Sequence, residues 1–229
     1  CPTACLIEKN ILDTISYLIM LSDQEKIERL KQESWQVDGF KITSDKSLEI
    51  FRNVFTSHGG NFYHLSLSEI PYLLKKLIAG TESIMFAAIP PKIDEIVENL
   101  EAEKKLNLEK EKNNPDLKNI VKKIKVGISG ADAFAAEIGS VIYYDFDLIK
   151  SYVAFLPDIH IVVTFDHLLF PTLFDALNDF WNKSKRLPPS IQLIQGPSRT
   201  GDIENKMIRP SHGPKEMHVV LIKGEKDEL

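Results

Sequence analysis

The chain has 229 residues, of which 43% are hydrophobic and 27% are charged, and its net charge is -5. A chain of this length and composition can bury a full apolar core in one compact domain. The negative charge argues against a nucleic acid or an anionic membrane as partner, because either one requires a basic face. The sequence contains no run of about 18 apolar residues, so we expect no membrane span.

The start of the chain predicts a helical arm. Leu6 to Leu21 carries apolar residues at helical spacing, and Ser22-Asp23-Gln24-Glu25 is typical of a capping box that begins a second helix. We therefore expect an N-terminal helical arm over residues 1–40 and one domain over residues 41–229. Polar residues at positions 8, 9, 10 and 13 interrupt the apolar run that a secretory signal requires, which favours a cytoplasmic protein.

The two ends of the chain carry features to which we assign no function. Cys1 and Cys5 cannot by themselves fill the four-ligand shell of an iron–sulfur cluster or a structural zinc, so we expect no metal in this chain. A first residue other than Met points to a processed or truncated start. Lys226-Asp227-Glu228-Leu229 matches an endoplasmic-reticulum retrieval signal, which we interpret as chance because no secretory segment and no disulfide framework accompany it.

Helices and strands alternate along the rest of the chain. Apolar runs predict strands at 61–65, 83–89, 126–129, 141–144, 160–165, 191–194 and 218–222. Helical spacing predicts helices at 48–57, 70–79, 92–112, 148–156 and 171–181, with one or two further helical turns at 133–138. This alternation indicates an α/β fold with a mainly parallel sheet and helices on both faces.

Two polar turns follow predicted strands. The first is Ser129-Gly130-Ala131-Asp132, where we expect Asp132 to cap a helix start; it leads to Glu137, a carboxylate among small apolar residues, and to Gly139-Ser140. The second contains Gly196, Ser198, Arg199, Thr200, Asp202 and Glu204, and it continues to His212 and Lys215. Ligands of open α/β sheets bind at the carboxyl ends of the strands, so we expect these turns to converge there. The alternative is that they only make turns and cap backbone amides.

The histidines do not predict a metal site. His58 and His64 are six residues apart, as are His212 and His218, whereas a helical zinc site requires histidines four residues apart. We expect His212 to be the functional histidine. His160 and His218 are expected to be structural, with the ring of His160 bonded to a nearby carbonyl.

The second half of the chain resembles a known family. Ser129 to Ser140, Phe155 to Val163, Gly196 to Glu204 and His212 to His218 together resemble the LUD domain, specifically the lactate-utilisation protein C family, over roughly residues 122–224. The resemblance implies a NagB/RpiA/CoA-transferase-like fold and a role in a multi-subunit system that oxidises lactate to pyruvate. It also implies an iron–sulfur protein and a second LUD protein as partners, with the iron–sulfur cluster on a partner subunit. Ile138, Ser140 and Pro210-Ser211 depart from the family pattern.

Three hypotheses for the function stay open. In the first, the protein is a subunit of the lactate-utilisation system and binds an anionic small molecule or cofactor through Gly130, Asp132, Ser140, Gly196, Ser198, Arg199, Thr200, Asp202, Glu204, His212 and Lys215. Arg199 would hold a carboxylate or phosphate with two parallel hydrogen bonds. In the second, Glu137 is the nucleophile or general base of a standalone transferase or isomerase. The third is an assembly module without catalysis.

Overall fold

The fold comes from a computed structural model, which describes residues 44–201, 207–208 and 213–224. All of these residues belong to the second of the two units into which the chain divides, Ile42–Leu229. The predicted helical arm over residues 1–40, and its boundary with the domain that follows, lie outside the described residues.

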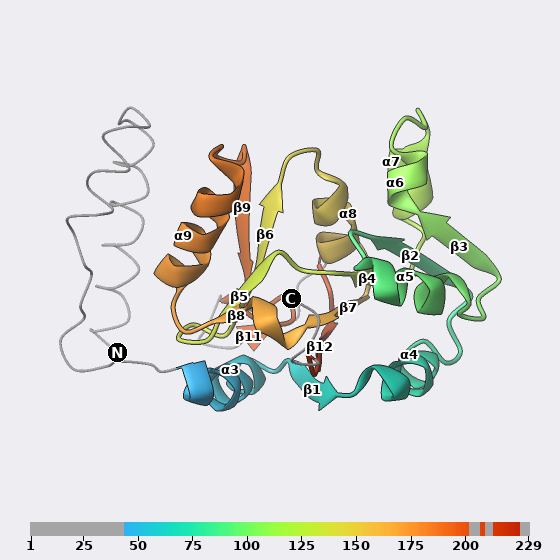
Figure 1. The fold of residues 1–229 in the computed structure, drawn as a ribbon. Helices are drawn as coiled ribbons and strands as arrows, with labels where there is room; N and C mark the ends of the chain where they lie inside the picture. The colour runs from blue at the N-terminus through green and yellow to red at the C-terminus, as the bar shows by residue number, and fades with distance from the viewer. Residues whose placement is uncertain (1–43, 202–206, 209–212, 225–229) are drawn as a thin grey trace. The chain divides into compact units, whose positions relative to one another are not determined.

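Six parallel strands form the main sheet, which we call sheet A. Its strand order is β1 (Asn61–Leu65), β12 (Glu216–Ile222), β7 (Ile159–Phe165), β4 (Val126–Ser129), β2 (Ser83–Ala87) and β3 (Lys104–Asn107). β12 comes late in the sequence, yet it lies between β1 and β7 (Figure 1). The predicted α/β fold with a mainly parallel sheet is confirmed.

Helices cover both faces of sheet A, also as predicted. On one face, α4 (Ile70–Leu77) and α5 (Pro91–Glu98) pack against side chains of the central strands such as Ile161. On the other face, α7 (Leu117–Val121) and α8 (Ile149–Phe155) pack against β2 and β4. Gly127 in β4 permits the close approach of α8, because a Cβ atom at this position would lie 2.4 Å from the carbonyl oxygen of Val153.

A second, smaller sheet packs on the same face of sheet A as α8, and we call it sheet B. Its order is β8 (Leu169–Phe170), β5 (Ala133–Ala135), β6 (Ser140–Asp145) and β9 (Ser190–Ile194). β6 runs antiparallel to β5 and β9, whereas β5 and β8 are parallel. Phe51 and Phe55 of α3 (Ser44–Ser57) pack against sheet B, and α9 (Leu173–Ser184) covers the outer face of β5 and β6 (Figure 1).

The remaining elements are short. They are η1 (Leu67–Glu69), α6 (Leu108–Glu111), η2 (Asp166–Leu168), β10 (Thr200–Gly201) and β11 (Met207–Ile208), of which the last two pair in antiparallel fashion. Among the residues described, no helix has both the length and the apolar character that crossing a bilayer would require.

Two predicted helical segments are wrong. Residues 133–135 form β5 instead of helical turns, because their apolar side chains are buried in sheet B between β6 and β8. The helix predicted over 92–112 ends at Glu98, and 104–107 forms the edge strand β3. Two exposed lysines precede the buried Leu106 in β3, a charge pattern that suits an edge strand as well as a solvated helix.

A buried cluster of hydrogen bonds joins the two sheets. Ser129 Oγ lies 2.8 Å from Tyr143 Oη and 3.0 Å from His160 Nε2, and all three residues are fully buried. Burial lowers the pKa of His160 to about 3, with a smaller contribution from His218, so the His160 ring is neutral at pH 7. His160 is structural, as predicted, but its partners are two hydroxyl groups and not a carbonyl.

We predict that His160 makes the protein less stable in mild acid. Because its folded-state pKa is lowered, the unfolded state binds one more proton between about pH 6.5 and pH 3. The free energy of unfolding should therefore fall by about 1.4 kcal/mol for each pH unit below 6.5. His160→Gln removes the titrating ring. In urea denaturation between about pH 7 and pH 5, the unfolding free energy of this variant should depend less steeply on pH, by up to about 1.4 kcal/mol per pH unit, which corresponds to one proton fewer taken up on unfolding. An unchanged slope in the variant would contradict a neutral, buried His160.

Candidate functional site

The turn between α3 and β1 forms the floor of the candidate site. Gly59 has φ +83° and donates its N–H to the carbonyl of Thr56 at 2.9 Å, while the N–H of Gly60 bonds the carbonyl of Phe55 at 3.2 Å. These two bonds are the Schellman arrangement that ends a helix, and the left-handed position favours glycine. The sequence indicated the end of this helix, but not that other loops pack on it.

Two loops approach the end of α3, and a third loop packs against one of them, at distances that exclude a side chain. A Cβ atom at Gly139 would lie 2.8 Å from the backbone nitrogen of Phe55, and one at Gly196 would lie 3.0 Å from the carbonyl oxygen of His58. A Cβ atom at Gly213 would lie 2.7 Å from Ser198 Cβ in the neighbouring loop. Each of these glycines also has a positive φ, which other residues rarely adopt. The motifs around 137–140, 196–200 and 213–215 are thus brought together by backbone contact.

Arg199 lies on the turn itself. A Cβ atom at Gly59 would lie 2.1 Å from Arg199 Nη2, so the guanidinium occupies the space that a side chain at position 59 would fill. Arg199 is exposed, and among the residues that the structure describes it forms no ion pair with a carboxylate. Its positive charge also lies near the carbonyl end of α3, where a cation is favourable. The geometry therefore allows two roles, an anchor for an anion and a cap for the helix.

The loop that carries Arg199 is tied to the segment before β12. The N–H of Ser198 donates to the carbonyl of Pro214 at 2.8 Å, and Thr200 begins the β10–β11 pair. Asp202, Glu204 and His212, which belong to the predicted site, lie outside the described residues.

Lys215 is held by an aspartate. Its Nζ lies 3.0 Å from Asp158 Oδ1, and Lys125 Nζ lies 3.3 Å from Asp158 Oδ2. The bond from Lys215, followed by the bond and charge of Lys125, lowers the pKa of Asp158. Lys215 remains half-exposed, but its ammonium already has an anionic partner, so it is a weaker candidate for ligand binding than Arg199.

Glu137 and Ser140 lie at the third loop. Glu137 is exposed, and its Oε1 accepts the N–H of Leu173, the first residue of α9, at 2.7 Å. This bond gives Glu137 a capping role that the sequence did not suggest, and its surroundings are not apolar as we expected. Ser140 is fully buried, and its hydroxyl has no hydrogen-bond partner among the described residues.

The three loops meet at a different edge of sheet A from the one we predicted. Gly60 and Lys215 directly precede β1 and β12, so the loops surround the ends at which these parallel strands begin, which we call the amino edge. Our prediction that the loops meet at the carboxyl edge of the parallel sheet was wrong, because the strand at 191–194 is β9, which belongs to sheet B and not to sheet A. β9 runs antiparallel to β6, and its carboxyl end leads back toward α3.

Gly130 and Asp132 do not join these loops. Gly130 follows β4 at the carboxyl edge, where a Cβ atom would lie 2.2 Å from the carbonyl oxygen of Ala88. Asp132 precedes β5, whereas Glu137 follows it, so the two carboxylates lie at opposite ends of that strand. The predicted convergence of Asp132 with Arg199 was therefore wrong.

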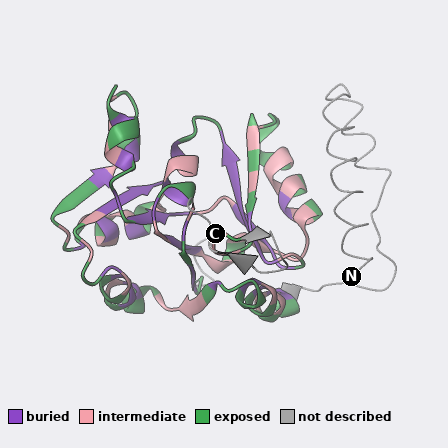
Figure 2. Cartoon of the chain, turned by 180° about the vertical axis from the view of Figure 1, so that it is seen from behind, coloured by how far each residue is buried: buried purple, intermediate pink, exposed green. Residues whose placement is uncertain are grey.

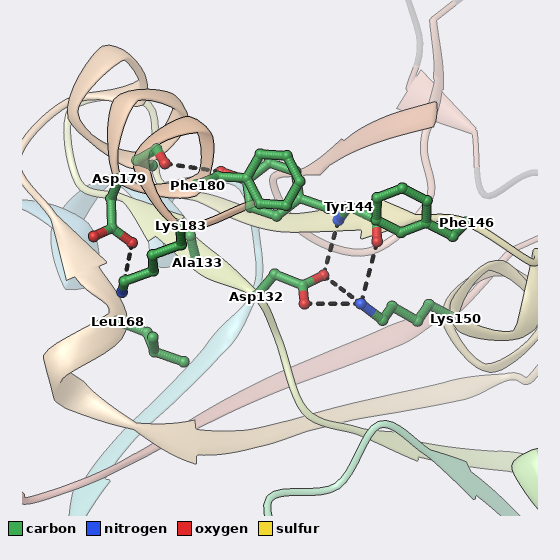
Figure 3. Close-up of a pocket in the computed structure, with 10 residues that line it drawn as sticks. Asp132, Ala133, Tyr144, Phe146, Lys150, Leu168, Asp179, Phe180 and Lys183 are labelled. Carbon is green, nitrogen blue, oxygen red and sulfur yellow. Dashed lines mark hydrogen bonds and ion pairs between the residues drawn. The ribbon is translucent and has the colours of Figure 1, made fainter. Parts of the chain in front are cut away.

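Asp132 instead lines a hollow of about 180 Å³ between sheet B and α9 (Figure 3). Its carboxylate accepts two bonds from Lys150 Nζ, at 2.8 and 2.6 Å, and one from the N–H of Tyr144 at 2.8 Å. The ring of Phe180 stacks on Tyr144 with ring centres 3.9 Å apart. Burial, followed by the charges of Asp132 and Asp179, raises the pKa of Tyr144. This hollow contains two neutralised ion pairs, Asp132–Lys150 and Asp179–Lys183, which leaves little net attraction for an anion.

Lys150 was missed by the sequence analysis. It is the only charged residue of α8, which marks it as unusual in an apolar helix, but nothing local connects it to Asp132 eighteen positions earlier. Within residues 44–201, 207–208 and 213–224, no group of three or more His, Cys, Asp or Glu side chains is arranged to hold a metal ion.

Comparison with known proteins places the chain in a family. The family model described as the LUD domain matches residues 24–222. The chain belongs to the LUD domain family. It is 29% identical over 100 residues to Lactate utilization protein C 1 of Bacillus mycoides, a match that covers 42% of this chain and 43% of that protein. It is 32% identical over 92 residues to Lactate utilization protein C of Halalkalibacterium halodurans, covering 39% and 40%. These matches span less than half the length of the relatives.

A solved structure of the same fold supports the architecture. A DUF162 family protein from Deinococcus radiodurans has a TM-score of 0.59 to this LUD chain at 17% identity, and the match covers 80% of this chain and all of that one. At this identity the likeness concerns the fold.

The contact between Arg199 and Gly59 predicts a specific double-mutant result. Gly59→Ala should cost about 1–2 kcal/mol for the left-handed backbone and a further amount for displacing the guanidinium. Gly80→Ala is the matched control, because Gly80 has φ +76° and open space at its Cβ position. Arg199→Ala combined with Gly59→Ala should bring the loss of unfolding free energy down to that of Gly80→Ala. Additive losses in the double variant, measured by urea denaturation, would show that the two residues do not touch.

Proposed function

We propose that this LUD protein is a component of a lactate-utilisation system and that it binds an anionic small molecule at the amino edge of sheet A. The observation that carries the proposal is Arg199, an exposed guanidinium without a described carboxylate partner, which lies on a glycine turn where two further loops converge. The names of the relatives, Lactate utilization protein C, support the choice of system.

The chemistry of the loops suits a small carboxylate. A guanidinium can meet a carboxylate with two parallel hydrogen bonds, which fix the orientation of the ligand as well as its position. Ser198, next to Arg199, brings a hydroxyl group that can serve a ligand hydroxyl such as that of a 2-hydroxy acid, and we include Thr200 in the proposed site because it follows Arg199 in the sequence. We include Asp202, Glu204 and His212 in the proposed site because they follow Arg199 closely in the sequence.

We propose that the redox centre of such a system lies on a partner protein. Oxidation of lactate to pyruvate releases two electrons and two protons, and an acceptor must take the electrons. The two cysteines of this chain are too few to ligate an iron–sulfur cluster. We therefore propose that an iron–sulfur protein carries the electrons and that a second LUD protein completes the assembly.

Substitution of Arg199 tests the anion site. Arg199→Ala should weaken the binding of lactate or pyruvate at least about tenfold, or about 1.4 kcal/mol. Arg199→Lys should weaken it almost as much, because a lysine replaces the two parallel bonds with a point charge. Isothermal titration calorimetry with lactate, pyruvate and phosphate measures the affinity, and a melting curve of each variant reports its stability.

Two basic residues provide matched controls. Lys215→Met removes a cation that already has a partner, and Arg186→Ala removes a guanidinium far along the sequence from the turn, so each should leave the affinity within about twofold. The absence of binding to the wild-type protein would overturn the anion site. A lower melting temperature with unchanged affinity in both Arg199 variants would make Arg199 a cap of α3 instead.

A further inference from the structure

The outer strand of sheet B is exposed to an unusual degree. β9 is the last strand in the order of sheet B, so its outer edge faces no other described strand. Ile191 and Leu193 are 43% and 40% exposed, and Leu187, just before the strand, is 44% exposed. Figure 2 shows the contrast with the neighbouring strand β6, which is buried.

The exposed side chains share one face of the sheet. Ile191 pairs with Tyr144 and Leu193 with Ile142, so all four side chains lie on the face that α9 covers. α9 packs on Tyr144 and Ile142 in β6 but leaves the β9 part of this face open. The result is an uncovered apolar stripe, Ile191 and Leu193, along an edge strand. Edge strands of this kind invite pairing with another chain unless charges or prolines protect them.

The stretch that contains β9 is basic, although the chain as a whole is acidic. Residues 180–201 contain Lys183, Lys185, Arg186 and Arg199 and no acidic residue, whereas the net charge of the chain is -5. Lys183 pairs with Asp179, and the guanidinium of Arg186 lies 5.1 Å from the centre of the exposed Phe146 ring. Because Lys183 is paired and Arg199 lies on the turn at Gly59, the basic rim next to the stripe consists of Lys185 and Arg186, which shortly precede β9.

These observations argue against a symmetric pairing of two copies. Two β9 strands paired about a twofold axis would bring two sets of basic residues together, and like charges across an interface are unfavourable. Pro188 and Pro189 block extension of the pairing before Ser190, but the five residues of β9 remain available. A segment with apolar residues at alternate positions matches the stripe, and acidic residues at the end of the segment that passes Ser190 match the rim.

We propose that β9 is the docking site of a partner protein, which adds an extended acidic segment as a further strand to the outer edge of sheet B. In this mode, main-chain hydrogen bonds to the open edge supply affinity, and alternate apolar side chains on the segment contact Ile191 and Leu193. In the proposed complex, acidic residues at the end of the segment that passes Ser190 meet Lys185 and Arg186. The proposal does not depend on anion binding by Arg199, although β9 leads directly into the loop that carries that residue.

Short labelled peptides test this docking site on the full chain. The probe alternates Glu or Asp with Val or Ile, and fluorescence anisotropy measures its binding. A peptide with Lys in place of the acidic residues, and an acidic peptide with alternate N-methylated amides, should each bind at least about tenfold more weakly. Leu193→Asp and the double substitution Lys185→Glu with Arg186→Glu should each weaken binding of the acidic peptide by a similar factor. The double substitution should also create binding to the lysine peptide.

Tyr72→Asp is the matched control, because Tyr72 is 77% exposed on α4, at the opposite face of sheet A, and should leave binding unchanged. Circular dichroism confirms that each variant is folded. Equal binding of the N-methylated peptide would overturn strand addition, and equal binding to the Leu193→Asp variant would overturn the location. A dimer of the wild-type chain that Leu193→Asp converts to a monomer, measured by light scattering, would show that a second copy covers β9 and would overturn the proposal.

Discussion

The packing of sheet B on sheet A determines where every candidate functional residue lies. Hydrogen bonds of Ser129 Oγ with Tyr143 Oη and His160 Nε2 join β4, β6 and β7, while Nδ1 of His160 has no hydrogen-bond partner among the described residues. Buried polar groups are costly unless they are paired, so this contact strongly favours one placement of β6 over the parallel sheet. Once β6 is placed, antiparallel pairing sets the direction of β5 and β9. Asp132 then lies at one end of sheet B, and the loops of Glu137 and Arg199 lie at the other.

The strand β7 is held at both ends by an aspartate. Before the strand, Asp158 binds Lys125 and Lys215, the residues that precede β4 and β12. After it, Asp166 lies 3.0 Å from Nε2 of His64, the fourth residue of β1, and its other oxygen accepts the N–H of Gly224, which follows β12. Four parallel strands are thereby connected through charged side chains at their ends, beyond the hydrogen bonds of the sheet itself. These bonds help to fix the segment in which Gly213 packs against Ser198 and Lys215 binds Asp158.

Much of the architecture could be read from the sequence, and the reasons for the failures are specific. The strands at 126–129, 160–165 and 218–222 are apolar and lie inside a covered parallel sheet, so local pattern and burial agree. β5 was not predicted because a run of only three apolar residues becomes a strand only through its partners in β6 and β8. The convergence of loops 137–140, 196–200 and 213–215 was anticipated from their motifs. The edge of sheet A at which they meet was predicted wrongly, because the sequence of 191–194 does not reveal that its neighbour is β6 and that the pairing is antiparallel.

The position of β12 has a consequence for how the protein is made. β1 is among the first described elements to leave the ribosome, yet β12 is its single neighbour among the described strands. The pairing of these strands closes a loop of more than a hundred residues, and such distant contacts form late because the chain must first lose much of its conformational freedom. During synthesis, therefore, the hydrogen-bonding edges of β1 and β7 stay open until β12 inserts between them. A ribosome that stalls before residue 216 releases a chain with two unpaired edges in the middle of its sheet, which makes it a natural substrate for chaperones and proteases.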